Sequence, residues 1–285
     1  KNIFVGNAGT TMRFLCSFAA LCLGETIIDG SWRMRQRPLN DLIDGLSPLG
    51  VEIISQNENG CPPVKIKGGG IDGGETEMNG DKSSQYFTSI LLSSPYAKKD
   101  VLIKVNGELT SRPYIDLTID LMRIFGVNVE NNSYSSFFIK SGNGYKAREY
   151  TIESDMTSAT YFFAAAAITG GKVKVKNINI STMQGDIKFV DILKKMGCIV
   201  LKGENFIEVE GGGLTGINVN MNEMPDAVQT LAVTSLFAKG ETRITGVSNL
   251  RIKETDRIKA LATELSRLGA QVRELDDGLV IIPGK

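Results

Sequence analysis

The residues of this chain that can do chemistry gather where helices are expected to begin. Small, basic, acidic and hydroxyl side chains meet at eight such places, which are residues 6–13, 33–38, 81–85, 111–114, 155–158, 184–186, 224–226 and 249–257. A helix N-terminus carries unpaired N–H groups and the positive end of the helix dipole, so it attracts anions. Arginine and lysine beside it add charge and paired hydrogen bonds. The pattern predicts a cleft for a substrate with phosphate and carboxylate groups.

Two of these places contain candidate anion contacts. In 6–13, Gly9 allows the backbone to approach a ligand, although a glycine turn before a buried helix explains the same residues. In 33–38, Arg33, Arg35 and Arg37 alternate, so an extended backbone sends all three side chains to one face, just before a helix that Pro38 is expected to open. A solvated charge run is the ordinary explanation. Like charges on one face favour a bound anion, and Arg37 is therefore a candidate.

Neutral and acidic candidates complete the set. Ser83, Ser84, Gln85 and Ser111 suit hydroxyl and phosphate contacts, although each serine is also a common helix cap. The chain has no histidine, so any proton transfer must use Asp, Glu, Lys, Tyr or Cys. Asp226 and Glu254 are candidates for base and acid. A helix cap is the alternative for Asp226, and an ion pair with Arg257 is the alternative for Glu254.

The elements that must position these residues form a repeat. An amphipathic helix ends at Gly50, Gly126, Gly197 and Gly269, at intervals of 71 to 76 residues, and two short strands follow each time. A more uniformly apolar helix and a strand precede each amphipathic helix. The repeat therefore reads α-β-α-β-β, four times. We expect the first helix of each repeat inside a ring and the second facing the sheets.

Composition sets the remaining expectations. At 285 residues the chain can hold two domains, and the glycine-rich and charged stretch 141–150 predicts a boundary that gives domains 1–145 and 146–285. The 32 basic and 32 acidic residues balance, which argues against nucleic-acid or membrane partners. Four scattered cysteines and no long apolar run predict free thiols and a cytoplasmic location. We expect a monomer without a bound metal.

The motifs in their order resemble the 5-enolpyruvylshikimate-3-phosphate synthase family over essentially the whole chain. The resemblance is carried by GNAGT followed by MR, RMRxRP, SSQ, SRPY, DxxSAxYF, QGD, MPDA and KETDR. It implies an α/β (α+β) fold with two domains of α-β-α-β-β repeats, an inside-out α/β barrel that closes over shikimate 3-phosphate and phosphoenolpyruvate. It also implies transfer of the enolpyruvyl group to the 5-hydroxyl with release of phosphate, without a metal or organic cofactor.

Matching positions imply the roles of single residues. The implied shikimate 3-phosphate contacts are Ser83, Ser84, Gln85, Ser111, Asp226, Asn249 and Lys253. The implied phosphoenolpyruvate contacts are Gly9, Arg37 and Arg257. Asp226 would take the proton of the attacking hydroxyl, and Glu254 would act as acid or base at the substrate methylene.

The chain departs from the family in having four repeats where the family has six, one fewer in each domain. We therefore expect the 285-residue chain alone to be weakly active or inactive. Two alternatives stay open. One is the related enzyme that acts on UDP-N-acetylglucosamine, which lacks the SSQ and KETDR groups. The other is a non-catalytic repeat fragment that only binds anions.

Overall fold

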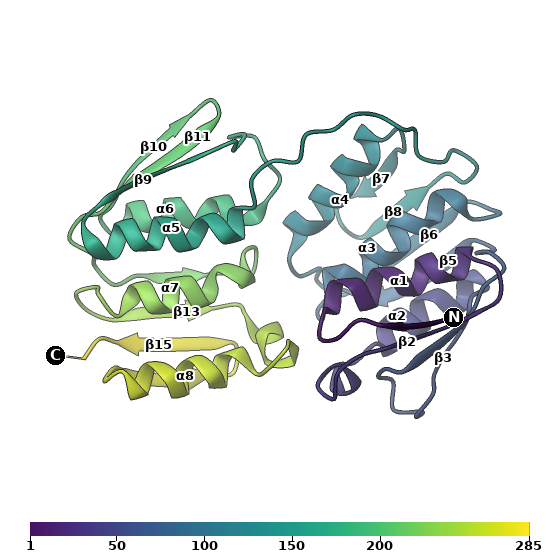
Figure 1. Cartoon of the computed structure of the whole chain (residues 1–285), viewed down its shortest axis with the longest axis horizontal. Helices are drawn as coiled ribbons and strands as arrows, with labels where there is room; N and C mark the ends of the chain where they lie inside the picture. The colour runs from purple at the N-terminus through teal and green to yellow at the C-terminus, as the bar shows by residue number, and fades with distance from the viewer. Residues whose placement is uncertain (285) are drawn as a thin grey trace. The chain divides into compact units, whose positions relative to one another are not determined.

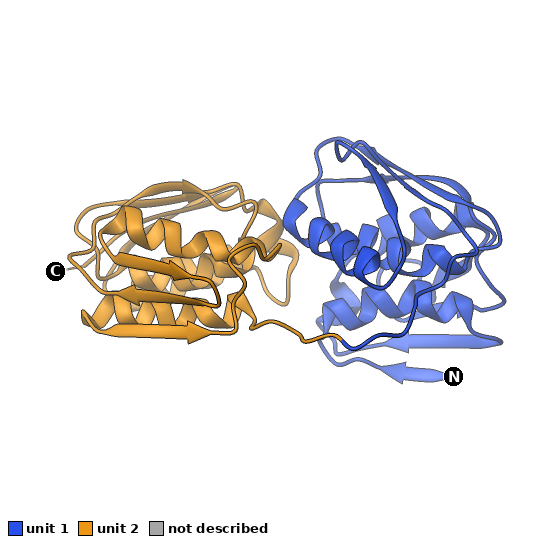
Figure 2. Ribbon diagram, turned by 90° about the horizontal axis from the view of Figure 1, so that it is seen from above, with its two compact units in different colours: residues 1–149 blue, residues 150–285 orange. Residues whose placement is uncertain are grey.

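The computed structural model describes residues 1–284, and the chain divides into two compact units, 1–149 and 150–285 (Figure 2). Unit 1 contains β1 (Asn2–Phe4), α1 (Gly9–Leu21), β2 (Glu25–Asp29), η1 (Met34–Gln36), α2 (Asn40–Leu46), η2 (Ser47–Leu49), β3 (Glu52–Ser55), β4 (Val64–Lys67), β5 (Gly74–Asn79), α3 (Ser84–Ser93), η3 (Ser94–Tyr96), β6 (Val101–Asn106), α4 (Arg112–Ile124), β7 (Val129–Asn132) and β8 (Ser136–Ile139), where η marks a short 3-10 helix.

Unit 2 contains the corresponding elements of the third and fourth repeats. They are α5 (Met156–Thr169), β9 (Lys172–Lys176), η4 (Gly185–Lys188), α6 (Phe189–Met196), β10 (Ile199–Gly203), β11 (Phe206–Glu210), β12 (Asn218–Asn220), η5 (Pro225–Ala227), α7 (Val228–Ser235), β13 (Thr242–Thr245), η6 (Ser248–Ile252), α8 (Arg257–Arg267), β14 (Gln271–Leu275) and β15 (Gly278–Ile282) (Figure 1). No helix within residues 1–284 is both long enough and apolar enough to cross a bilayer.

Each repeat builds one small sheet, as the α-β-α-β-β pattern predicts. The sheets have the orders β1-β2-β4-β3, β5-β6-β8-β7, β10-β11-β9 and β12-β13-β15-β14. The central pairs are antiparallel, with Ile28 opposite Val64 in the first sheet and Ile244 opposite Leu279 in the last. Three sheets contain an additional outer strand, which is parallel to its neighbour and precedes the first helix of its repeat. Among these three strands, only β1 has an apolar sequence typical of a strand. The others, β5 and β12, were not predicted because most of their residues are polar.

The glycine that ends each amphipathic helix has the predicted left-handed backbone. Its φ is +83° at Gly50, +91° at Gly126, +118° at Gly197 and +92° at Gly269. This conformation costs a residue with a Cβ atom free energy, which explains the recurrence of glycine. The predicted repeat is therefore confirmed at the level of backbone geometry.

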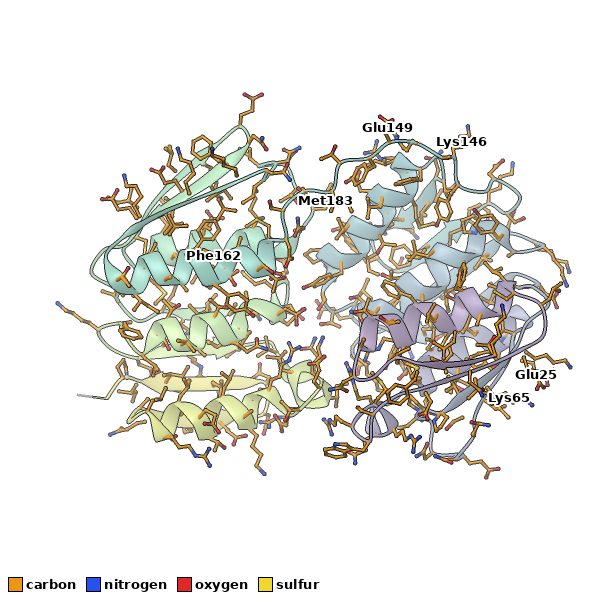
Figure 3. All side chains as sticks on the ribbon, viewed as in Figure 1. Glu25, Lys65, Lys146, Glu149, Phe162 and Met183 are labelled. Carbon is orange, nitrogen blue, oxygen red and sulfur yellow. The ribbon has the colours of Figure 1, made fainter. Side chains whose placement is uncertain are left out.

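The first helices are less enclosed than the sequence predicts. In unit 1, α1 packs against α3 and also against β2 and β4, and in unit 2, α5 packs against α7, β9 and β11. Tyr161 and Phe162 on α5 remain 58% and 60% exposed, and Figure 3 labels Phe162 on this helix. The expectation that the first helix of each repeat lies inside a ring is wrong for this face of α5. Each unit contains two such helices, and two helices packed together leave part of each helix surface uncovered.

The hydrophobic cores follow the division into units. One cluster of buried apolar residues lies within 12–139 and the other within 156–281. The predicted boundary at 145 falls just before the division at 149, because residues 145–148 still pack on unit 1. The Tyr145 hydroxyl donates to the Leu92 carbonyl at 2.9 Å, and the Lys146 amide donates to the Phe125 carbonyl at 2.8 Å. Figure 3 shows Lys146 and Glu149 on this connecting segment.

Candidate functional site

In unit 1 the candidate Arg37 lies against the start of α1. Its side chain is 2% exposed, and Nη1 donates to the Asn7 carbonyl at 3.3 Å. A Cβ atom on Gly9 would lie 2.5 Å from Nη2 of Arg37, so the two residues fit only because Gly9 has no side chain. The sequence paired neither residue with the other. The structure places the guanidinium at the first turn of a helix, where an anion is favoured.

The prediction of three arginines on one face is wrong. Residues Met34–Gln36 form a 3-10 helix, so the alternation of an extended strand is absent. Arg35 instead forms an ion pair with Asp29 through two hydrogen bonds, and Arg33 donates to Gln36. Pro38 does not open the next helix either, because α2 begins at Asn40. Of the three arginines, Arg37 alone is buried.

The serines and glutamine of the SSQ motif occupy the start of α3. Ser83 caps the helix by accepting from the Gln85 amide at 3.3 Å, which is the ordinary role considered for it. Ser84 is buried, and it is the first residue of the helix. Gln85 is held at both ends, since Oε1 accepts from Arg13 at 2.6 Å and Nε2 donates to Thr10 at 3.0 Å. The motifs on α1 and α3 are therefore joined by hydrogen bonds.

Ser111 has an unusual backbone at the start of α4. Its φ is +56°, a left-handed conformation that serine rarely adopts, and its side chain makes no capping hydrogen bond. Ordinary helix capping therefore does not explain this serine. Strained residues of this kind concentrate at functional sites, which supports keeping Ser111 among the candidates.

In unit 2 the two candidate carboxylates meet on one arginine. Arg257 Nη1 donates to Asp226 at 2.6 Å, while Nη2 and Nε donate to Glu254 at 2.6 Å and 3.1 Å. The Gln229 amide, oriented with its oxygen toward Arg257, accepts from Nη1 at 3.1 Å. From the sequence, only Glu254 was expected to pair with Arg257. The structure joins all three.

The charge of Arg257 is stabilised by this arrangement. Burial opposes the charge, but the hydrogen bonds and charges of Asp226 and Glu254 outweigh it and raise the pKa of Arg257 above its ordinary value. Asp226 does not cap its helix, since Met224 occupies the cap position and Asp226 lies in the first turn of η5. Its carboxylate is directed to Arg257 instead.

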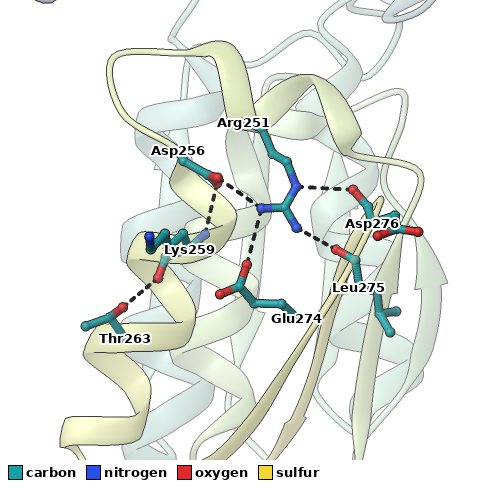
Figure 4. Close-up of polar contacts among 7 residues, drawn as sticks. All are labelled: Arg251, Asp256, Lys259, Thr263, Glu274, Leu275 and Asp276. Atoms are coloured by element: carbon teal, nitrogen blue, oxygen red, sulfur yellow. Dashed lines mark hydrogen bonds and ion pairs between the residues drawn. The ribbon is translucent and has the colours of Figure 1, made fainter.

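The loop that carries Lys253 and Glu254 is fixed by Arg251. Figure 4 shows Arg251 donating to Asp256 at 2.9 Å, to Glu274 at 3.2 Å, and to the carbonyls of Leu275 and Asp276. Asp256 in turn caps α8 by accepting from the Lys259 amide at 3.0 Å. The KETDR segment is thereby attached both to the hairpin of β14 and β15 and to the helix that follows it.

Asn249 offers an unused acceptor beside the same loop. Its side chain is buried, and Oδ1 receives no hydrogen bond from any residue of 1–284. A buried amide oxygen without a donor costs free energy comparable to a lost hydrogen bond. A ligand hydroxyl would satisfy it.

Comparison with known proteins decides the family. A sequence profile described as EPSP synthase (3-phosphoshikimate 1-carboxyvinyltransferase) matches residues 1–285. The chain belongs to the EPSP synthase family. A 3-phosphoshikimate 1-carboxyvinyltransferase from Marinomonas sp. is 49% identical over 99% of this chain and 67% of its own length. The one from Sulfurovum sp. is 46% identical over 99% of this chain and 66% of its own length. The chain thus spans about two thirds of the length of these relatives.

Solved structures agree with the EPSP synthase assignment. EPSP synthase from Acinetobacter baumannii superposes with a TM-score of 0.74 at 27% sequence identity, covering 99% of this chain and 65% of that one. The predicted α/β enolpyruvyl transferase fold is confirmed by this match. The family resemblance seen in the motifs is likewise confirmed.

Two residues of the EPSP synthase motifs emerge only from the structure. Arg13 is 5% exposed, stacks over the Tyr86 ring at 5.3 Å and holds Gln85. Asp186 of the QGD motif is 4% exposed and accepts a hydrogen bond from Thr157. Charged residues inside helix-start motifs were the signal available in the sequence, but burial and partners were needed to separate them from solvated charges.

A hollow of about 220 Å³ in unit 1 has the wrong charge for the expected substrates. It is lined by Asp41, Asp44, Glu77, Met78, Asn79 and Asn106. Three carboxylates repel phosphate and carboxylate groups. Among residues 1–284 there is also no group of three or more acidic or cysteine side chains placed to hold a metal ion.

Proposed function

We propose that this chain carries residues that perform enolpyruvyl transfer from phosphoenolpyruvate to the 5-hydroxyl of shikimate 3-phosphate, with release of phosphate, and that this activity is weak or absent in the 285 residues alone. The observation that carries the proposal is Arg257 held between Asp226 and Glu254. Two carboxylates on one cation can serve as separate proton acceptor and donor, and the cation suits an anionic substrate.

The proposed steps balance in protons. Asp226 accepts the proton of the 5-hydroxyl as the hydroxyl oxygen bonds to C2 of phosphoenolpyruvate, and Glu254 in its protonated form delivers a proton to the methylene carbon. This gives a tetrahedral intermediate. Loss of phosphate, which takes the proton held by Asp226, with return of the methyl proton to Glu254 then forms the enolpyruvyl ether and restores both carboxyl groups. Arg257 donates to the two carboxylates through Nη1, Nη2 and Nε. Since a guanidinium has five N–H donors, Arg257 can also donate to an anion bound beside these carboxylates.

Each unit carries residues to which a binding role is proposed. In unit 2, Asn249 and Lys253 would contact shikimate 3-phosphate, with Asn249 Oδ1 accepting from a hydroxyl. In unit 1, the proposed contacts of shikimate 3-phosphate are Ser83, Ser84, Gln85 and Ser111, and those of phosphoenolpyruvate are Gly9 and Arg37. The support is the position of each group at a helix start, with Arg37 and Ser84 buried.

We further propose a monomer located in the cytoplasm. All four cysteines are free thiols, which suits a reducing compartment. Light scattering coupled to size-exclusion chromatography tests the oligomeric state, and a mass twice that of the chain would contradict it.

Phosphate release from phosphoenolpyruvate tests the function. Release should depend on shikimate 3-phosphate, and Asp226→Asn should lower the rate by roughly 10²–10⁴-fold while calorimetry still detects shikimate 3-phosphate binding. Asp191→Asn, an exposed carboxylate paired with Lys202, is the matched control. Binding of UDP-N-acetylglucosamine in place of shikimate 3-phosphate would instead indicate the related transferase. Anion binding without any turnover in the complete gene product would indicate a scaffold.

A further inference from the structure

Asp186 is a buried carboxyl group that the proposed steps do not use. Its Oδ2 accepts a hydrogen bond from the Thr157 hydroxyl, whereas Oδ1 is enclosed and receives no hydrogen bond from any residue of 1–284. Burying an ionised carboxylate with one hydrogen-bond donor and no cation costs free energy of folding. Such a group therefore either becomes protonated or is kept ionised for a function.

The elements around Asp186 bring two other carboxyl groups to it. The first turn of α5 carries Thr157 and is capped by Asp155, and α5 packs against both η4, which holds Asp186, and η5, which holds Asp226. Burial raises the pKa of Asp186 to about 6. The Thr157 hydrogen bond opposes this shift, and the charges of Asp226 and Asp155 add to it.

The three carboxyl groups are compensated unequally. Asp226 has Arg257 at 2.6 Å, and Asp155 accepts from the backbone amides of Thr157 and Ser158. Two charged residues of η4 and α6 pair with other residues. Lys188 forms an ion pair with Glu223, and Asp191 forms an ion pair with Lys202. Among residues 1–284, Asp186 forms no ion pair with a lysine or arginine, so the electrostatic effect of its charge on Asp226 is not neutralised.

We propose that Asp186 is a positioning residue whose negative charge strengthens Asp226 as a base by opposing the effect of Arg257. Arginine at hydrogen-bond distance stabilises the ionised form of Asp226 and so weakens it as a proton acceptor. A second negative charge nearby has the opposite effect. The interaction is reciprocal, because two coupled groups shift each other equally. This inference rests on the proposed role of Asp226 as the base. The electrostatic coupling between Asp186 and Asp226 is independent of that role.

The coupling is tested in the 285-residue chain without any activity. Aspartates labelled with ¹³C at the carboxyl carbon are titrated by NMR, and the Asp186 signal is assigned from its loss in Asp186→Asn. We expect a midpoint near pH 6, and a lower midpoint in Asp226→Asn but not in the control Asp191→Asn. A midpoint near the ordinary 3.8, or one that Asp226→Asn leaves unchanged, would overturn the proposal.

Kinetics of the complete gene product then test the effect on the base. Asp186→Asn keeps an oxygen for the Thr157 hydrogen bond but has no charge, so we expect kcat to fall by roughly tenfold with KM unchanged, well short of the loss in Asp226→Asn. The acid limb of the kcat profile near pH 6 should disappear. Thr157→Val removes the hydrogen bond and keeps the charge, so a purely structural role for Asp186 predicts that Thr157→Val reproduces the kinetics of Asp186→Asn. Absence of turnover in the unaltered protein would count against the proposed function, while the titration would still decide the coupling.

Discussion

At the scale of single residues, the candidate site depends on contacts between side chains that lie far apart in the sequence. Arg37 occupies the space that a Cβ on Gly9 would need, and Arg257 joins Asp226 to Glu254. In both groups an arginine fixes the geometry. Small changes at these positions should therefore alter binding or proton transfer more than stability.

Replacing Gly9 by alanine should displace Arg37. The new Cβ would meet Nη2 at 2.5 Å, and the guanidinium is the flexible end of its side chain, so the guanidinium moves and the fold survives. Loss of one charge-assisted contact, worth about 1.5–3 kcal/mol, should weaken phosphoenolpyruvate binding by at least roughly tenfold in calorimetry. Gly213→Ala, which introduces no contact within 4 Å, is the control. Unchanged phosphoenolpyruvate affinity in Gly9→Ala would show that Arg37 is not a contact.

Asp186 should make stability depend on pH. Its folded pKa of about 6 lies above the ordinary 3.8, so between these values the folded state binds the extra proton and stability falls as pH rises. The loss approaches about 3 kcal/mol by pH 7, at about 1.4 kcal/mol per pKa unit. Urea unfolding from pH 4 to 7 should show this slope in the native chain and a shallower one in Asp186→Asn. If unfolding free energy depends on pH in the same way in both proteins, Asp186 is not the source of the pH dependence.

At the scale of elements, the repeat is maintained by glycines at helix ends and by capped loops. The four glycine stops share a left-handed backbone but differ in what surrounds them. A Cβ on Gly197 would lie 2.6 Å from the Gly213 carbonyl oxygen, whereas one on Gly269 meets nothing within 4 Å. A Cβ on Gly50 would collide with a carboxylate oxygen of Asp72, and one on Gly126 would lie 3.1 Å from the Lys146 side chain. Conformation is therefore common to the repeat, whereas a backbone atom in close contact is found only at Gly197 among the four stops.

Alanine at these two stops should separate the two effects. Gly269→Ala should cost about 1–2 kcal/mol of unfolding free energy, the strain of a left-handed residue with a Cβ atom. Gly197→Ala should cost more, since a backbone oxygen must also move. Urea denaturation of both variants measures the difference in unfolding free energy. Equal losses would mean that the backbone near Gly213 moves away from the new Cβ without a cost in free energy.

The loop of η6 and α8 offers a second test at this scale. Arg251→Ala removes hydrogen bonds to Asp256 and Glu274 and to two carbonyls, and should cost about 1–3 kcal/mol. Arg267→Ala at the end of α8 breaks one exposed pair with Glu264 and should change stability by about 0.5 kcal/mol or less. Similar losses in both variants would show that the Arg251 contacts do not stabilise the loop.

At the scale of the whole molecule, the chain consists of two units with separate hydrophobic cores. Every buried apolar residue of the first cluster lies before residue 149, and every one of the second lies after 150. Exposed ion pairs such as Glu25 with Lys65, labelled in Figure 3, join elements within a unit and contribute little to its stability. Core burial must stabilise each unit.

Residues 1–149 and 150–285 should each fold when expressed separately. Because neither core borrows apolar residues from the other unit, the amide NMR signals of each fragment should coincide with those of the intact chain away from the cut. Collapsed or broad spectra from either fragment would contradict this expectation. Fragment 150–285 should also retain the titration of Asp186.

The sequence by itself determined the repeat, the helix stops and the family, because apolar periodicity and glycine positions are local properties of the chain. It did not determine which charged residues meet. Arg35 and Arg37 are two residues apart, yet a 3-10 turn sends one to Asp29 and buries the other against Gly9. Asp226 and Arg257 lie 31 residues apart and share a hydrogen bond. Burial and long-range partners arise from packing between elements, so only the tertiary structure identified Arg13, the Asp226–Arg257–Glu254 group and the buried carboxyl of Asp186.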